Sequence, residues 1–294
     1  MFDAIYSNQR KSFFLIFFFF LLLLACGYVF GEMSGVGYQM GALIAFIISS
    51  ASVFTSYYYS DKIILGLSGA RPLRKRDHPH LFHTVEGLAL AAGMPAPRVY
   101  VINDMSPNAF ATGRNPEHGV IAITTGLLAK LNRVELEGGV AHEMAHIKNY
   151  DILVGSLAAV LCGAVVIMSD IMRRMMFYGG SRRSSRGGGQ VQVVLMIAGL
   201  VLMILAPIAA QFIRLAISRK REYMADATGA VLTRYPPGLA SALKKLADDK
   251  TPVVKASQAT AHLFTVNPFK GKGLSKLFST HPPLQARITA LEAM

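Results

Sequence analysis

The stretch GGVAHEMAHIKNYDILVGSLAAVLCGAVVIM, Gly138 to Met168, joins two patterns of different kinds. Its first half contains His142, Glu143 and His146 in the order H-E-x-x-H. On a helix, the i, i+4 spacing places both imidazoles on one face, where they can hold a zinc ion, with Glu143 beside the water that the metal activates. The second half is apolar enough to enter a lipid bilayer. The sequence therefore predicts a metal site next to a membrane.

Four long apolar runs without charge interrupt the chain of 294 residues. They cover Ser12 to Phe30, Val36 to Tyr59, Ile152 to Ser169 and Val191 to Ile213. Each run is close to or above the ~20 residues that span a hydrocarbon core about 30 Å thick. Buried helices of a soluble protein can give the same pattern, but four such runs in one chain favour a multi-pass helical membrane protein.

The first run has features of a processed segment as well as of a membrane helix. It follows Arg10 and Lys11 and ends in LLAC at Cys26, which resembles a signal peptide or a lipoprotein processing site. The second run follows after only Gly31 to Gly35, so we expect an uncleaved hairpin. Cys26 and Cys162 both lie in apolar runs, so we expect neither a disulfide framework nor a cysteine metal site.

The net charge of +13 is compatible with binding either to nucleic acid or to an anionic membrane surface. No basic surface interleaved with aromatic residues is visible, so we expect no nucleic acid partner. Basic clusters instead follow the second and fourth apolar runs, where they mark the cytoplasmic side and favour anionic lipid headgroups. These clusters are Arg71, Arg74, Lys75 and Arg76, and Arg214, Arg219, Lys220 and Arg221.

The apolar runs divide the chain into four predicted parts. Residues 1–60 form an N-terminal transmembrane hairpin, and residues 61–151 form the first part of a catalytic domain with the H-E-x-x-H motif. Residues 152–213 form a second membrane hairpin, and residues 214–294 form the second part of the catalytic domain, with the third zinc ligand.

Within the catalytic domain we expect a mostly α (α+β) fold. LFHTVEGLALAAGMP predicts a helix that ends at Gly93 and Pro95, and RVYVIN, NAFATG and GVIAIT predict a small antiparallel meander. A long helix from about Arg133 is predicted to carry the metal motif into the third apolar run. Pro282 and Pro283 suit the start of a short final helix.

A hydrolytic zinc site needs a third protein ligand, and few acidic residues lie within reach of a site beside the membrane. SRKREYMADATGA offers Glu222 and Asp226 at i, i+4 on one helical face. Glu222 can complete the metal site, and Asp226 can accept the free N–H of a ligand histidine and fix its tautomer. In the alternative interpretation, both acids form ion pairs with the neighbouring Arg219 and Arg221.

Four motifs, AHEMAHIKNYD, SRKREYMAD, PNAFATGRNP and LFSTHPP, resemble those of the HtpX-type membrane zinc endopeptidases, relatives of the CAAX prenyl endoprotease. The resemblance covers nearly the whole chain. It implies a gluzincin-like site in which His142, His146 and Glu222 bind one Zn²⁺ per chain and Glu143 is the catalytic base. It also implies polypeptide substrates, notably misfolded or membrane proteins, and a role in stress response and protein quality control. The implied location is the bacterial inner membrane, with the active site facing the cytoplasm.

The resemblance makes Asn108 and His281 candidates for holding substrate or the developing oxyanion. Asn108 begins a predicted strand whose exposed edge can pair with an extended peptide, although an asparagine after Pro107 also suits a simple turn. His281 precedes two prolines that keep its backbone extended, so its imidazole can donate to an oxyanion, but it also fits a surface loop.

Three further histidines, His78, His80 and His83, resemble a metal cluster. No acidic or cysteine partner follows them at ligand spacing, so we expect a solvated helix start.

The ligands His146 and Glu222 must contact one ion and therefore lie on the same side of the membrane. The chain between them must then cross the membrane an even number of times. The third and fourth runs then form a hairpin that brings the third ligand back to the first two. The loop between them carries Arg173, Arg174, Arg182, Arg183 and Arg186, which conflicts with an external position under the positive-inside rule. Either this loop is an exception or the two runs dip into the bilayer without crossing; their length favours crossing.

Two alternative functions remain at this point. One is a processing protease for a defined substrate, as the CAAX relatives are. The other is a membrane scaffold or transporter with a structural zinc. Glu143 would have no structural duty in such a zinc site, and the apolar runs carry almost no ionisable groups for a transport path.

Overall fold

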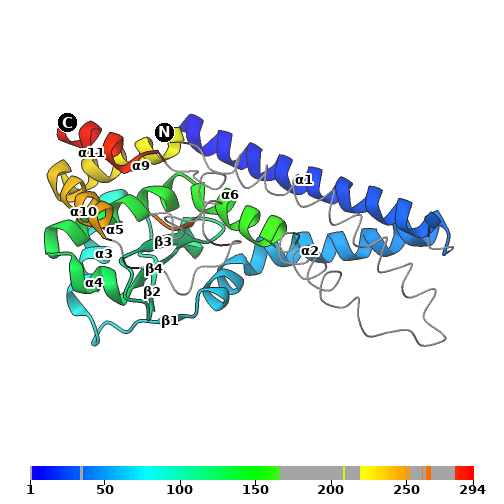
Figure 1. The fold of residues 1–294 in the computed structure, drawn as a ribbon, viewed down its shortest axis with the longest axis horizontal. Coiled ribbons are helices and arrows are strands. Elements are labelled where there is room, and N and C mark those ends of the chain that lie inside the picture. Colours follow the sequence, from blue (N-terminus) through cyan, green and yellow to red (C-terminus); the bar gives the residue numbers. More distant parts are fainter. Residues whose placement is uncertain are drawn as a thin grey trace.

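The computed structural model describes residues 2–33, 36–163, 165, 208, 219–249, 251, 260, 263–265 and 282–294 (Figure 1). The third apolar run beyond residue 165, the fourth run except residue 208, the arginine-rich loop between them and His281 lie outside these described residues. The predicted second membrane hairpin therefore remains an expectation.

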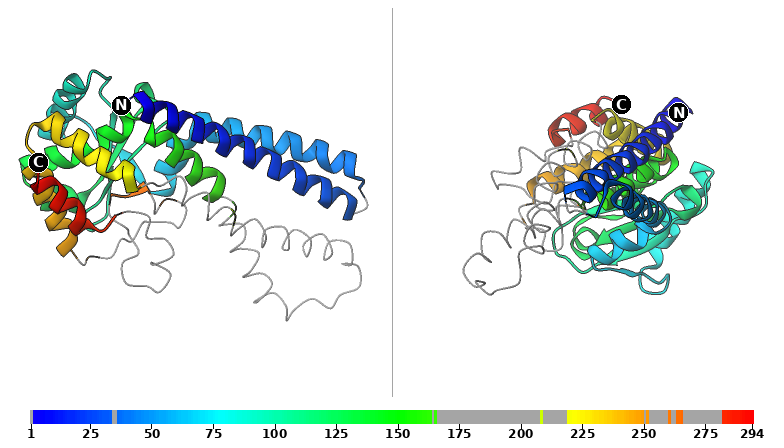
Figure 2. Two further views of the ribbon diagram at one scale, coloured as in Figure 1. Left: turned by 90° about the horizontal axis from the view of Figure 1, so that it is seen from above. Right: turned by 90° about the vertical axis from the view of Figure 1, so that its right-hand side faces the viewer.

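Two long helices, α1 (Phe2–Met33) and α2 (Tyr38–Leu67), lie side by side and extend from one end of the globular part (Figures 1 and 2). Glycines bring them close together, since a Cβ at Gly31 would lie 2.8 Å from the Cα of Gly41. Among the described residues, Ile5–Tyr28 and Tyr38–Leu67 are the segments long and apolar enough to cross a membrane. The second helix extends to Leu67, beyond the expected boundary at residue 60.

A four-stranded sheet follows, in the order β1-β2-β4-β3. Its strands are β1 (Ala70–Pro72), β2 (Arg98–Ile102), β3 (Ala109–Thr112) and β4 (Val120–Thr124). β2 and β4 are parallel, with Arg98 opposite Val120, whereas β1–β2 and β3–β4 are antiparallel. The expected antiparallel meander is therefore wrong. Every residue of β4 is buried, so this strand lies inside the sheet, where both faces are covered, and β3 is left at the edge.

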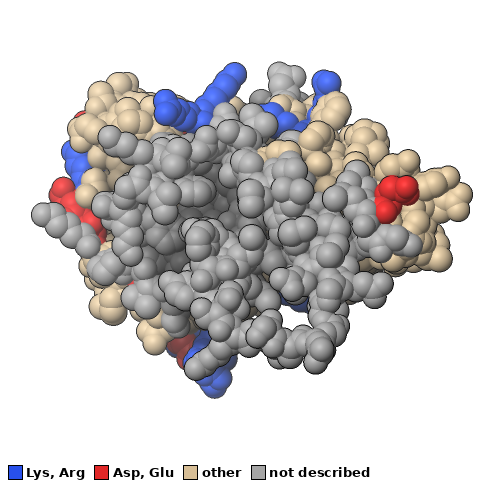
Figure 3. All heavy atoms as spheres, turned by 45° about the vertical axis from the view of Figure 1, so that its right-hand side comes forward, with Lys and Arg blue, Asp and Glu red and all other residues tan. Residues whose placement is uncertain are grey.

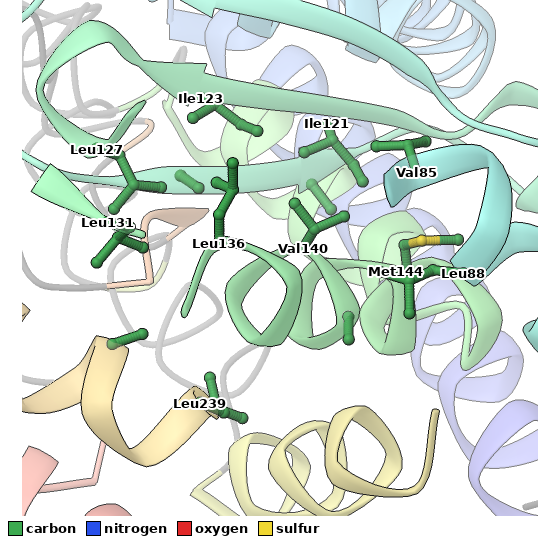
Figure 4. Packing of buried hydrophobic residues seen from close by; sticks show 14 of the residues in the cluster. Val85, Leu88, Ile121, Ile123, Leu127, Leu131, Leu136, Val140, Met144 and Leu239 are labelled. Atoms are coloured by element: carbon green, nitrogen blue, oxygen red, sulfur yellow. The ribbon is translucent and has the colours of Figure 1, made fainter. Parts of the chain in front are cut away.

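One face of the sheet packs against α3 (Pro79–Ala92) and α5 (Arg133–Lys148). Figure 4 shows side chains of α5 pointing toward β4, and α3 covering the end of this layer. The packed side chains follow the expected periods, i, i+4 on α5 and i, i+2 on β4. They are Leu136, Val140 and Met144 from α5, Ile121 and Ile123 from β4, and Leu81, Val85 and Leu88 from α3. As expected, α3 ends at Gly93, whose φ of 66° is left-handed.

The opposite face of the sheet packs against the end of α2. Phe110, Val120 and Ala122 contact a cluster that contains Ile64 and Phe264, all of them buried. The second long helix is therefore fixed to the sheet through its final turns. Short elements complete this half of the molecule: η1 (Pro116–His118) and α4 (Thr125–Lys130).

The helix that carries the metal motif begins at a capping box and ends before the apolar run. Asn132 Oδ1 accepts from the Glu135 amide at 3.0 Å, and Glu135 Oε2 accepts from the Asn132 amide at 2.8 Å. At the other end, Tyr150 has a left-handed φ of 59°, and α6 (Asp151–Leu157) starts after it. The expected continuous helix from Arg133 into the third run is therefore wrong.

The break at Tyr150 has a packing reason. It turns α6, and the π-helical turn η2 (Ala158–Cys162) that follows, onto the first long helix. Leu153, Val154 and Leu157 pack there against Leu15 and Phe19. A left-handed non-glycine residue costs roughly 1–2 kcal/mol, which this buried cluster offsets.

The remaining helices, α9 (Arg219–Thr233), α10 (Pro236–Asp248) and α11 (Leu284–Glu292), lie on the side of α5 away from the sheet (Figure 1). Close approach depends on glycine, because a Cβ at Gly138 would lie 2.7 Å from the Leu239 amide nitrogen. A Cβ at Gly229 would lie 3.1 Å from the His142 amide nitrogen. α5 is thus enclosed between the sheet and a helical layer, and α11 begins after Pro283 as expected.

Candidate metal centre

Two adjacent helices bring three predicted ligands together. His142 and His146 lie on α5 and Glu222 on α9, and their ligand atoms lie within 4.8 Å of one another. The two Nε2 atoms are 3.2 Å apart. Carboxylate oxygens of Glu222 lie 3.8 Å from His142 Nε2 and 3.7 Å from His146 Nε2. The structure thus places these side chains around one point, as the motif spacing predicted.

Each histidine is oriented by a carboxylate on its other ring nitrogen. Asp226 Oδ1 lies 2.9 Å from His142 Nδ1, and Asp151 Oδ2 lies 3.0 Å from His146 Nδ1. A carboxylate only accepts hydrogen bonds, so both Nδ1 atoms donate and, in the neutral rings, both Nε2 atoms carry lone pairs. Two lone pairs facing each other at 3.2 Å repel unless a proton or a metal cation lies between them. Two imidazole nitrogens and one carboxylate form a donor set that suits zinc.

The charge around His146 favours its protonated form when no metal competes. Burial alone would lower the pKa of this imidazole, but the hydrogen bond to Asp151, together with the charges of Glu222 and Glu143, raises the pKa to about 9. A metal ion binds the neutral imidazole, so metal binding must release this proton.

Arg287 completes the centre, and sequence reasoning missed it. Its side chain is 0% exposed, and its Nε and Nη2 donate to the two oxygens of Asp226, each at 2.7 Å. Its Nη1 lies 3.2 Å from Glu222 Oε2. Burial would raise the pKa of Asp226, but the hydrogen bonds from His142 and Arg287 hold it well below its usual value. Asp226 is therefore an anion that balances a buried guanidinium.

A signal for Arg287 was present in the sequence. In LQARITALE, the arginine stands on the same helical face as Ile288 and Leu291, which are buried. A lone charge on the apolar face of a short helix is buried only when it is paired. The helix that follows the LFSTHPP motif therefore contains a residue that contacts two of the predicted metal ligands.

Asp151 and Asn8 were also missed, and they connect the centre to the first long helix. Asn8 is 2% exposed, and its Nδ2 donates to Asp151 Oδ1 at 2.6 Å and to the Asn149 carbonyl at 2.9 Å. Arg221 Nε lies 3.5 Å from Asp151 Oδ1. The alternative in which Arg219 and Arg221 neutralise Glu222 and Asp226 is not supported, because Arg287 contacts both of these acids and Arg221 contacts Asp151.

Glu143 lies between the ligand histidines in sequence and faces the edge of the sheet. Its Oε1 lies 2.7 Å from the Thr265 hydroxyl, which also lies 2.9 Å from the Ala109 carbonyl. A hydroxyl has one proton, so it donates to one of these two acceptors at a time. Glu143 is thus held close to β3.

The other candidate residues have mixed outcomes. Asn108 precedes the edge strand β3 and is 2% exposed, and its Oδ1 accepts from the Ala109 amide at 3.1 Å. Its role toward substrate stays a prediction, as does that of His281, which lies outside the described residues. His78, His80 and His83 lie at the start of α3 and belong to no metal-binding group among the described residues.

The chain is similar in sequence to known proteins over most of its length. The profile of Peptidase family M48 matches residues 75–294. A "Protease HtpX homolog" of Dictyoglomus turgidum is 45% identical over 293 residues, covering 100% of this chain and 94% of the relative. The homologue of Pyrococcus furiosus is 46% identical over 274 residues, covering 91% and 93% of the two chains. The crystal structure of S. mikatae Ste24p is similar with a TM-score of 0.49 and 18% identity, covering 99% of this chain and 67% of that one. The chain belongs to peptidase family M48 and is a metalloendopeptidase.

Proposed function

We propose that this chain is a membrane-bound zinc endopeptidase that cleaves misfolded or membrane proteins at the cytoplasmic face of the bacterial inner membrane. The observation that carries the proposal is the convergence of His142, His146 and Glu222, with Glu143 on the same helix. A structural zinc site needs no such additional carboxylate, whereas hydrolysis needs a base.

The residues would divide the work of peptide hydrolysis. His142, His146 and Glu222 would hold zinc, which when bound supplies a Lewis acid that polarises the substrate carbonyl and acidifies an attacking water. Glu143 would accept the proton of that water and return it to the departing amine. The Thr265 hydroxyl, 2.7 Å away, would orient the Glu143 carboxylate.

Tyrosines support a membrane position for α1 and α2. At the tip of the hairpin, the rings of Tyr28 and Tyr38 lie 5.3 Å apart. Tyr58 follows Tyr38 by 20 residues on α2. At 1.5 Å per residue this separation is about 30 Å, the thickness of a hydrocarbon core. Tyrosine is enriched at both membrane interfaces.

Charge supports the orientation of the hairpin. Arg10 and Lys11 lie at its base and Lys62 at the matching level of α2, whereas Glu32 lies near its tip. On the face in Figure 3, the visible Lys and Arg side chains lie at the upper, left and lower margins of the molecule. By the positive-inside rule the base is cytoplasmic. Asn8 connects that base to the metal centre, so the active site would lie at the cytoplasmic surface.

Metal analysis and proteolysis together test the assigned roles. Glu143→Gln and Glu222→Gln should each abolish cleavage of an unfolded protein by the purified, detergent-solubilised chain. After identical chelator dialysis, Glu143→Gln should keep about one zinc per chain, because all three ligands remain, and Glu222→Gln should lose it. Glu137→Gln, on the same helix, is the matched control and should change neither. Zinc retained by Glu222→Gln and lost by Glu143→Gln would show that the ligand assignment is wrong.

Orientation and substrate choice need separate measurements. In a chain without its native cysteines, a cysteine at Val36 should react with an impermeant reagent in intact cells, and a cysteine at Leu90 should react only after lysis. Both side chains are exposed. The reverse labelling would place the active site outside. If the chain cleaved lipidated peptides and left unfolded proteins intact, its function would be processing of a defined substrate and not quality control.

A further inference from the structure

We propose that a pocket at the base of α2 binds the phosphate-bearing headgroup of an anionic phospholipid. The pocket has a volume of about 260 Å³ and is lined by Tyr57–Tyr59 and by Lys62, Arg98, Arg114 and His118. It lies between the final turns of α2 and the turn that joins β3 to β4, apart from the metal centre. The inference rests on the proposed membrane position of α2.

The pocket has excess positive charge. Arg98 donates to Asp61 Oδ2 at 2.6 Å, so that acid compensates one cation. Within the described part of the chain, Lys62 and Arg114 form no ion pair. Lys62 Nζ instead lies 5.1 Å from the ring centroid of Tyr59, and Arg114 Cζ lies 5.2 Å from that of Tyr58. Contact with the face of an aromatic ring orients a cationic side chain but does not neutralise its charge.

The turn that carries Arg114 is held in shape before any ligand binds. Asn115 Oδ1 accepts from the His118 amide at 3.1 Å and lies 2.6 Å from His118 Nδ1. Gly113 has a φ of 137°, and a Cβ there would collide with the His118 carbonyl. Arg114 Nη2 lies 2.6 Å from His118 Nε2. An arginine fixed in this way loses less conformational entropy when it binds phosphate.

The depth of the pocket in the membrane favours a lipid as its ligand. Tyr58 lies about 30 Å along α2 from Tyr38, so its ring lies where the hydrocarbon core ends and the headgroups begin. Asp61 and Lys62 then begin the charged part of α2. The three tyrosines give the pocket an amphipathic wall, suited to the glycerol region of a lipid, and the cations lie at phosphate level. A free phosphate would leave the tyrosine wall without a partner.

Tryptophan fluorescence can test the pocket directly, because the chain contains no tryptophan. The Tyr58→Trp variant would be reconstituted in vesicles that contain a brominated lipid, which quenches a nearby indole. The mole fraction of brominated phosphatidylglycerol needed for a given quenching should be about fivefold lower than that of brominated phosphatidylcholine. Adding Arg114→Gln should remove this preference. Arg71→Gln, which removes an equal charge from an exposed position on the same side, should leave the preference unchanged.

Other outcomes would overturn the proposal. Equal quenching by both lipids would show that the pocket does not prefer an anionic headgroup. Equal effects of Arg114→Gln and Arg71→Gln would show that the preference comes from the general positive charge of the surface and not from the pocket. Relief of quenching by inorganic phosphate at millimolar concentration would assign the pocket to a soluble anion. Tyr28→Trp, at the far end of the hairpin, should be quenched by both lipids alike. Absence of quenching at both positions would refute the membrane position itself, whereas its absence at Tyr58→Trp alone would refute only the lipid site.

Discussion

Replacing Asp151 by alanine should weaken zinc binding without removing a ligand. Asp151 Oδ2 accepts from His146 Nδ1 at 3.0 Å, and Asn8 holds the carboxylate from the other side at 2.6 Å. Loss of such an orienting carboxylate costs 10- to 100-fold in metal affinity, or about 1.4–2.7 kcal/mol. All three ligands remain in Asp151→Ala, so the protein should still bind one zinc per chain, but more weakly.

The size of this effect should depend on pH. Asp151 is the main cause that raises the pKa of His146, which reaches about 9. A raised pKa means that a proton occupies the ligand below pH 9, so the zinc affinity of the wild type should fall about tenfold per pH unit below that value. Asp151→Ala lowers the pKa of His146 and relieves this competition. The difference between mutant and wild type should therefore be largest at pH 9 and smaller at pH 7.

Competition with a chromophoric chelator in detergent, at pH 7 and pH 9, measures both quantities. Asp248→Ala, which removes an exposed carboxylate from α10, is the control and should match the wild type at both values. Wild-type affinity of Asp151→Ala at pH 9 would refute the orienting role. A loss of equal size at both pH values would show that Asp151 does not set the pKa of His146.

Asp226→Ala should weaken zinc binding by a similar 10- to 100-fold and should also lower the unfolding temperature, because Arg287 loses both of its 2.7 Å bonds; chelator competition and thermal unfolding report the two effects. Arg287→Met should cost about 3–5 kcal/mol of stability by removing the guanidinium that balances the buried charge of Asp226, and the double mutant Asp226→Asn, Arg287→Met should recover part of this loss in thermal unfolding. Gly138→Ala should lower the unfolding temperature, since the new Cβ would meet Leu239 backbone at 2.7 Å, whereas Gly139→Ala, whose Cβ would meet nothing within 4 Å, should be tolerated.

The sequence predicted the features that depend on local spacing. The i, i+4 patterns of α5 and α9 identified residues that lie around one point, and the glycine and proline positions marked the C-terminal end of α3 and the start of α11. These predictions succeeded because helical periodicity fixes a face without knowledge of its partner.

Features that depend on distant partners could not be predicted in the same way. Parallel pairing of β2 with β4 arises because β3 lies on the far side of β4, an order that three short strand patterns do not reveal. The break at Tyr150 has no glycine or proline to mark it, because packing of α6 on α1 imposes it. Asn8 lies 143 residues from the carboxylate that it contacts. Only the folded chain shows that contact.

The buried pair of Asp226 and Arg287 bears on how the protein is made. These residues are 61 positions apart, and Arg287 is 145 positions from His142. During translation, the helix with the two histidines leaves the ribosome long before the guanidinium that balances Asp226 and Glu222. The hairpin α1–α2 is synthesised earlier still and can enter the bilayer first. The metal centre would thus be completed late in biosynthesis. A nascent chain would not cleave neighbouring proteins before its hairpin is inserted and α11 has been synthesised.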